Sequence, residues 1–218
     1  MPVTEWFIIK SLTIPSSWLA VLLAILITGI IVWRKFGKET EDWFSDAAIL
    51  FLLVWKFSVV ITDFEMIIDS PLSILYFNGG SVGLFLGLSA ALIKLLWKFK
   101  GENWPPSELV ALLFSMVMFQ SLYQLFMVIL NESVLWVKIV TIVLFAGLAT
   151  LTWLKIAESH TWQIQLSVLF LITHIFVALI QPQGILQTPL LVTSLFVICG
   201  FVAYLFTYNH HEFTEEKL

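Results

Sequence analysis

TDFEMIIDSPLSILYFNGGSVG, residues 62–83, is the most informative segment of the chain, because carboxylates, a proline and a glycine pair lie here between two long apolar runs. Pro71 predicts one break in the chain, and Asn78-Gly79-Gly80 predicts a second. Between these breaks, the apolar segment Leu72–Phe77 is too short to cross a bilayer. We therefore expect a short re-entrant or interfacial segment here, with a membrane-spanning helix on each side.

The composition of the whole chain indicates that it folds in a lipid bilayer and not in water. Of its 218 residues, 60% are hydrophobic and 12% are charged, and the mean hydropathy is +0.97. Soluble domains carry about 25% charged residues, so a water-soluble fold could not bury this much apolar surface. Open sheets would leave unpaired amides in lipid, and the apolar runs lack the alternating polarity of a transmembrane barrel. The sequence predicts an all-α integral membrane protein.

Seven apolar runs are long enough to cross a bilayer as helices of about 20 residues. Pro15 precedes the first run, and Asp46 is expected to cap the second. Residues 1–209 are predicted to form a single membrane domain, a seven-transmembrane-helix bundle, which is followed by a polar cytoplasmic tail over residues 210–218. The expected spans cover residues 18–33, 47–68, 81–99, 109–130, 134–156, 162–180 and 190–208.

The distribution of lysine and arginine predicts the orientation in the membrane. If the N-terminus lies outside, eight of the 11 basic residues fall on the inner side, two fall outside and Lys56 lies within a span. Inner loops of membrane proteins are enriched in these residues. We expect a multi-pass protein of a bacterial cell membrane, with the C-terminus in the cytoplasm and residues 62–83 at the outer face. The segment Glu5–Ser17 is too short to span and is expected to lie on the bilayer surface.

Lys56 is the most informative single residue, because a charge near the middle of a span costs a few kcal/mol. Asp63 follows seven residues later on the same helix face. One interpretation places Lys56 in a polar cavity, where it meets a lipid headgroup. The other is a lysine that snorkels or belongs to a structural polar pair. Both interpretations remain open.

Other polar residues within the spans allow both structural and functional interpretations. His174 in the sixth span is a candidate proton carrier, although a hydrogen bond to a neighbouring helix is the commoner role of such a histidine. Gln120 and Gln124 share one face of the fourth span, where amides need partners in lipid. These partners are either another helix or the wall of a polar cavity. Gly83 and Gly87 form a smooth face for close packing.

The pattern does not indicate a cofactor, a metal centre or catalytic residues. No cluster has the ligand spacing of a metal site, and Cys199 is the single cysteine. No basic patch with interleaved aromatic residues predicts nucleic-acid binding.

The order of features resembles that of prolipoprotein diacylglyceryl transferase. The similar pieces are SLTIPSSWLAVL, DSPLSILYFNGGSVG and LLFSMVMFQSLYQ, which lie within about residues 7–130. That family has seven spans with the N-terminus outside, and it moves a diacylglyceryl group from phosphatidylglycerol to a lipoprotein cysteine. The resemblance implies a membrane lipid or a lipoprotein as partner. The implied lipid or ligand cavity is lined by Lys56, Asp63, Asn78, Gly79, Gly80 and Gln120.

Two departures from the family pattern affect the expected activity. Asn78 stands where the family has a histidine before its Gly-Gly pair. Gln120 and Tyr123 stand at the best-matching positions for an essential arginine and an asparagine. Without that arginine, a phosphate lacks a charged partner in the fourth span, which leaves Lys56 as the candidate. We therefore expect a protein that binds a phospholipid or a lipoprotein near the outer leaflet without the family reaction.

Two other functions are kept as alternatives. A small transporter, or a subunit of one, would use Lys56, Asp63 and His174 as a polar path. A membrane assembly partner would use the Gly83–Gly87 face and the acidic tail to bind another membrane protein.

Overall fold

The computed structural model describes residues 2–9, 12–101 and 106–215. Within these ranges, seven helices are long and apolar enough to cross a membrane, which confirms the predicted all-α membrane fold. The chain is a multi-pass membrane protein. Its internal contacts divide it into two compact units, which are described separately below. Unit 1 consists of Met1–Gly37 and Trp104–Leu218, and unit 2 consists of Lys38–Asn103. The sequence, in which we expected one membrane domain over residues 1–209, gives no sign of this division.

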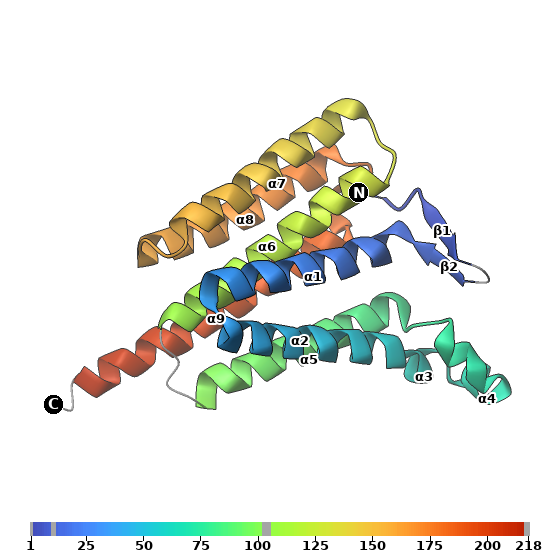
Figure 1. Cartoon of the computed structure of the whole chain (residues 1–218), viewed down its shortest axis with the longest axis horizontal. Coiled ribbons are helices and arrows are strands. Elements are labelled where there is room, and N and C mark those ends of the chain that lie inside the picture. Colours follow the sequence, from blue (N-terminus) through green and yellow to red (C-terminus); the bar gives the residue numbers. More distant parts are fainter. Residues whose placement is uncertain (1, 10–11, 102–105, 216–218) are drawn as a thin grey trace. The chain divides into compact units, whose positions relative to one another are not determined.

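Unit 1 combines a short β-hairpin with long helices (Figure 1). Its elements are β1 (Trp6–Ile9), β2 (Leu12–Pro15), α1 (Ser16–Phe36), α6 (Pro106–Leu130), α7 (Leu135–Lys155), α8 (His160–Ile180), the 3₁₀ helix η2 (Gly184–Leu186) and α9 (Thr188–Glu215).

The central helix of unit 1 is α6, which packs against α1, α7, α8 and α9. Side chains are buried along 67% of its most apolar stretch, against 22–44% for the other spans. A helix that is apolar on all sides is expected to lie inside a bundle, and α6 fits this rule. Its polar side chains are therefore placed among other helices rather than in lipid.

The N-terminal segment forms an antiparallel hairpin, in which Trp6 is opposite Pro15 and Ile8 is opposite Thr13. No strand was predicted here, although aromatic and β-branched residues favour one. The side chain of Asn131, at the turn after α6, holds both ends of the hairpin. Its Oδ1 accepts hydrogen bonds from the Thr4 amide at 2.8 Å and from the Ser16 hydroxyl at 2.7 Å.

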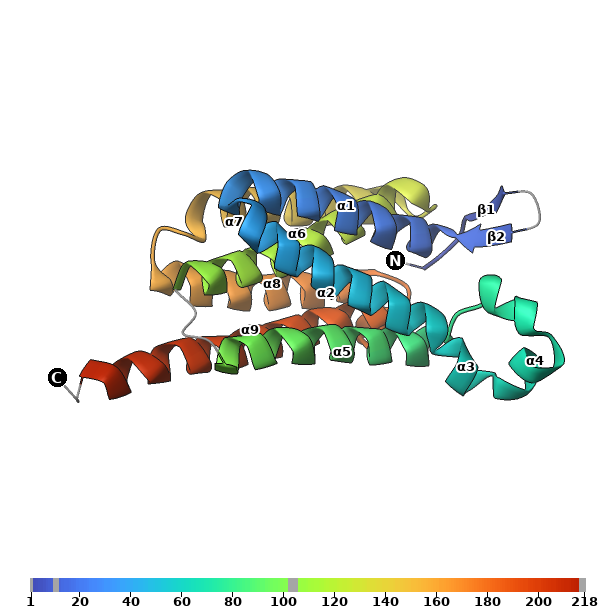
Figure 2. The same cartoon turned by 60° about the horizontal axis from the view of Figure 1, so that its bottom comes forward.

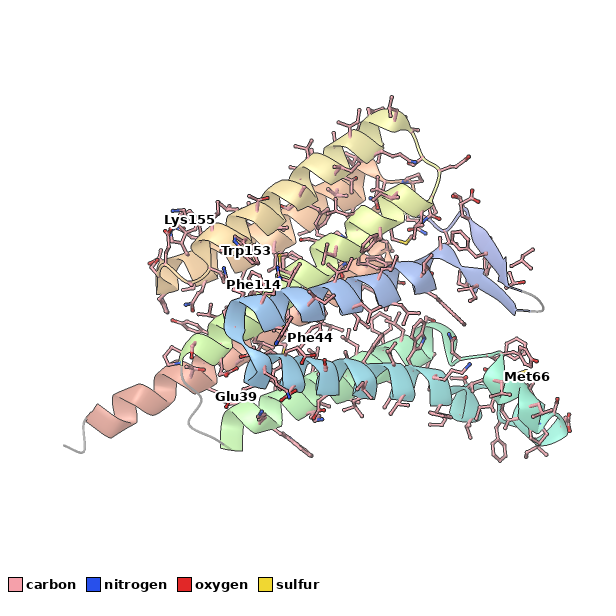
Figure 3. The ribbon with its side chains drawn as sticks, viewed as in Figure 1. Glu39, Phe44, Met66, Phe114, Trp153 and Lys155 are labelled. Atoms are coloured by element: carbon pink, nitrogen blue, oxygen red, sulfur yellow. The ribbon has the colours of Figure 1, made fainter. Side chains whose placement is uncertain are left out.

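A lysine fastens the end of α1 to the end of α7. The ammonium group of Lys35 donates to the carbonyl of Trp153 at 2.6 Å and lies 4.5 Å from the centre of the Trp153 ring. Phe114 of α6 lies beside Trp153 (Figure 3), with ring centroids 5.9 Å apart. The contact satisfies a carbonyl in the last turn of α7, which has no partner within its own helix.

Unit 2 is an antiparallel helix pair whose two helices are joined by short helical segments (Figure 2). Its elements are α2 (Lys38–Phe57), α3 (Val59–Thr62), α4 (Phe64–Asp69), the 3₁₀ helix η1 (Pro71–Leu75) and α5 (Gly80–Gly101).

Glycines on α5 allow the two helices of unit 2 to approach closely, as the Gly83–Gly87 spacing predicted. A Cβ atom on Gly87 would lie 2.7 Å from the Phe51 carbonyl oxygen, and a Cβ on Gly83 would lie 3.1 Å from that of Trp55. Gly79 extends the same face by one turn, against the Ser58 side chain. The partner of this face is therefore α2 of the same chain.

Several predicted boundaries are wrong. The segment KETEDW was expected to be a loop, but α2 already begins at Lys38. Asp46 therefore does not cap a helix; it lies within α2 and pairs with Lys94 of α5 at 3.1 Å. The predicted span 47–68 is interrupted after Phe57 and after Thr62. At the other end of the chain, α9 continues to Glu215, into the predicted polar tail, whose residues 216–218 lie outside the described ranges.

Candidate functional site

The Gly-Gly turn before α5 is held by side chains and backbone from the end of α2. The amide of Gly79 donates to the Trp55 carbonyl at 3.3 Å, and the Trp55 indole N–H donates to the Gly80 carbonyl at 3.1 Å. Gly80 has a φ of +56°, a conformation that glycine adopts without strain. These contacts fix the turn beside the residues that follow Trp55 on α2.

Lys56 follows Trp55 directly, and its ammonium group binds the chain just before the turn. It donates to the carbonyls of Leu75 and Phe77, both at 2.9 Å. These carbonyls lie at or just after the end of η1, where a helix leaves acceptors unsatisfied. An ammonium group has three N–H donors, so one donor of Lys56 remains without an acceptor among the described residues. No carboxylate in the described ranges forms an ion pair with Lys56.

The start of α5 adds further donors next to this lysine. Asn78 Oδ1 accepts from the Gly80 amide at 2.9 Å, which leaves the side-chain NH₂ of Asn78 available as a donor. The amides of Ser81 and Val82, in the first turn of α5, have no acceptor among the described residues. The first amides of a helix carry the positive end of its dipole. Lys56, Asn78, Gly79 and Gly80 thus form one positive, donor-rich group at the end of unit 2.

Asp63 does not bind Lys56. Its carboxylate accepts a hydrogen bond from Thr62 at 2.7 Å and is exposed. Glu65 and Asp69 are also exposed, at the ends of the short helix α4. This arrangement agrees with the interpretation of the three carboxylates as a solvated helix end.

Gln120 belongs to unit 1 and has a partner there. Its side chain is 1% exposed, and Nε2 donates to the Pro189 carbonyl of α9 at 3.0 Å. His174 is also in unit 1, between Gln124 and Thr193. The six residues expected to line one cavity therefore fall into a group of four around Lys56, the separate carboxylate of Asp63, and Gln120 within the helices of unit 1.

Sequence reasoning did not identify Trp55 and Ser58 as residues that position the site. Their signal was present, since Phe51, Trp55 and Ser58 are spaced to share one helix face, as are Gly79, Gly83 and Gly87. Within the described ranges, no three His, Cys, Asp or Glu side chains are close enough to hold a metal ion.

The fold and this group of residues define a polytopic α-helical membrane protein with a cationic, glycine-containing turn at one end of a helix pair. No protein-family model, curated protein or solved structure matches the chain.

Proposed function

We propose that this protein binds the anionic headgroup of a membrane phospholipid at Lys56 and the Asn78-Gly79-Gly80 turn. The observation that carries the proposal is the hydrogen bonding of Lys56. Two backbone carbonyls hold its ammonium group in place, yet no carboxylate of the described residues neutralises it. Lys56 lies in the last turn of α2 and not near the middle of a span as expected, but it is still within the candidate span Lys38–Thr62. A charge in a spanning segment is expensive and marks a functional site by default. A lipid phosphate supplies the missing negative charge.

The chemistry of the neighbouring groups supports a phosphate rather than a neutral ligand. Phosphate oxygens accept hydrogen bonds from ammonium groups, amides and helix N-termini. Lys56, the NH₂ of Asn78 and the first amides of α5 are donors of these three kinds. The resemblance to prolipoprotein diacylglyceryl transferase points to the same class of ligand and to the outer leaflet as its location. We further propose that the glyceryl transfer itself is absent, since α6 contains no arginine.

The test compares phospholipid retention by native mass spectrometry of the purified protein. Lys56→Met keeps the length of the side chain but removes its charge, and Lys56→Arg keeps the charge. Lys138→Met on α7 is the matched control, because it removes a lysine near the start of another span. A hydrogen bond to a charged group contributes about 1.5–3 kcal/mol, which corresponds to roughly a 10- to 150-fold change in affinity.

We expect Lys56→Met to lose phosphatidylglycerol preferentially, while Lys56→Arg and Lys138→Met retain it. Equal retention by Lys56→Met and the unmodified protein would refute the proposal. Formation of a diacylglyceryl-modified cysteine peptide from phosphatidylglycerol by the purified protein would refute the proposed absence of transfer.

A further inference from the structure

The end of unit 1 that is remote from the hairpin carries a lysine held over three aromatic rings (Figure 3). The ammonium group of Lys35, in the last turn of α1, donates to the Trp153 carbonyl of α7 at 2.6 Å. It lies 4.5 Å from the centre of the Trp153 ring, 5.1 Å from that of Phe114 on α6 and 5.9 Å from that of Phe36. Three helices therefore fix the position of one cation.

The charge of Lys35 is not neutralised by the described part of the chain. One of its three N–H donors binds the carbonyl, and the other two have no acceptor there. Neither ion pair found in the described ranges includes Lys35. Lys155, at the end of α7, differs in this respect, because both carboxylate oxygens of Glu158 accept from it at 2.8 Å. Arg34 is exposed and, like Lys35, forms no ion pair among the described residues, so that α1 ends with two uncompensated positive charges.

The surface beside Lys35 is apolar and exposed. Trp33 is 54% exposed, Trp153 is 43% exposed and Leu154 is 60% exposed. All three lie in the last turn of a spanning helix, where tryptophan side chains meet lipid headgroups. The indole N–H of Trp153 has no acceptor among the described residues and is a further donor beside the ammonium group. An anion that reaches Lys35 across this surface is therefore one that is joined to acyl chains.

The phosphate of a phospholipid meets both requirements. Its oxygens accept hydrogen bonds from ammonium and N–H groups, and basic residues between spanning helices near one membrane face bind acidic headgroups. We propose that unit 1 binds the headgroup of an anionic phospholipid at Lys35 and the Trp153 indole, and that Arg34 adds a second positive charge at the same helix end. The acyl chains run along α7 past Thr150, which is exposed and lies one turn before Trp153 on the same face. This site uses no residue of unit 2 and is therefore separate from the proposed site at Lys56.

Site-specific photocrosslinking measures which lipid lies beside Trp153. The photoreactive amino acid p-benzoylphenylalanine replaces Thr150 in one protein. In a second protein it replaces Ile172 of α8, which is 56% exposed and samples the bulk lipid. Each protein is irradiated in nanodiscs that contain equal amounts of phosphatidylglycerol and phosphatidylcholine. Mass spectrometry then gives the ratio of the two crosslinked lipids.

We expect the ratio of phosphatidylglycerol to phosphatidylcholine at residue 150 to exceed that at residue 172 about fivefold, the factor that one basic residue near an acidic membrane surface contributes. Lys35→Met should abolish this enrichment, and Lys35→Arg should retain it. Lys35→Gln is the second variant if Lys35→Met does not fold, because its amide still carries a donor for the Trp153 carbonyl. Lys138→Met, which removes a lysine near the other end of α7, should leave the ratio unchanged.

Equal ratios at residues 150 and 172 in otherwise unmodified protein would overturn the proposal. So would an enrichment that persists in folded Lys35→Met or Lys35→Gln. An enrichment that Lys138→Met removes to the same extent would also overturn it, since acidic lipid would then be attracted to the protein as a whole. Lys56→Met is expected to leave the ratio at residue 150 unchanged, so that this test and the retention test at Lys56 can fail separately.

Discussion

The close approach of Gly87 to the backbone of α2 gives the sharpest prediction, because one added methyl group should separate α2 from α5. In Gly87→Ala, the new Cβ would lie 2.7 Å from the Phe51 carbonyl oxygen and 3.1 Å from the Trp55 amide nitrogen. Both atoms belong to backbone, so no side chain can turn away. Restoring an ordinary contact of 3.4 Å to the carbonyl moves α2 by about 0.7 Å.

The size of the steric effect is isolated by comparison with a second glycine, which also lies within a spanning helix but has no close neighbour. Gly147 lies within α7, and a Cβ there would meet no atom within 4 Å. Replacing a glycine in a helix by alanine gains about 1 kcal/mol through backbone entropy alone, and this gain is common to both substitutions. The difference between Gly87→Ala and Gly147→Ala is therefore the steric cost, which is about 1–3 kcal/mol for overpacking.

The measurement is the free energy of unfolding in mixed micelles, from titration with sodium dodecyl sulfate followed by far-UV circular dichroism. Gly147→Ala should be as stable as the unmodified protein or more stable. Gly87→Ala should be less stable than Gly147→Ala by the amount given above. If the two variants differ by less than about 0.5 kcal/mol, below the range expected for overpacking, the glycine face does not set the distance between α2 and α5.

Three further predictions concern contacts within unit 1, and each is measured as a change in unfolding free energy in the same micelles. Asn131→Leu should cost about 2–4 kcal/mol, because it leaves the buried hydroxyl of Ser16 and the amide of Thr4 without an acceptor; an unchanged free energy would contradict the proposed anchoring of the hairpin. Lys35→Met should cost about 1–2 kcal/mol through loss of the Trp153 carbonyl bond and the cation–π contact. Arg34→Met should be neutral, because Arg34 is exposed and forms no ion pair among the described residues. Ser159→Ala should cost about 1 kcal/mol, because Ser159 caps α8 by accepting from the Trp162 amide, and Ser159→Asp should retain most of this stability.

The spans that begin and end at strong local signals were the predictable part of the fold. Pro106 starts α6, and the turn at Asn131 separates it from α7, so the predicted boundaries differ from the observed ones by at most three residues. The start of α2 was missed for a physical reason. Its first turn carries Glu39 and Glu41, which make the segment polar like a loop but also favour a helix N-terminus through the dipole. Hydropathy identifies the part of a helix that lies in lipid, and a polar extension falls outside it.

The candidate site was predictable only in part, because its most important contacts are made to backbone atoms. The position of Lys56 in a span and the glycine spacing on α5 are visible in the sequence. The acceptors of Lys56 are the carbonyls of Leu75 and Phe77, and every residue has a carbonyl, so no residue type marks them in advance. The sequence suggested Asp63 as a partner because carboxylates are recognisable by type, and the structure assigns Asp63 to Thr62 instead.

The use of carbonyls rather than a carboxylate has a consequence for the chemistry of Lys56. A carboxylate partner would cancel the positive charge and leave a neutral pair with little attraction for an anion. Carbonyl oxygens hold the ammonium group by dipoles, so that its net charge of one remains. The same two bonds restrict the side chain, which reduces the entropy lost when a ligand binds. The geometry therefore keeps a cation both charged and fixed beside the donors of Asn78 and the first turn of α5, and this combination favours a phosphate over a neutral ligand.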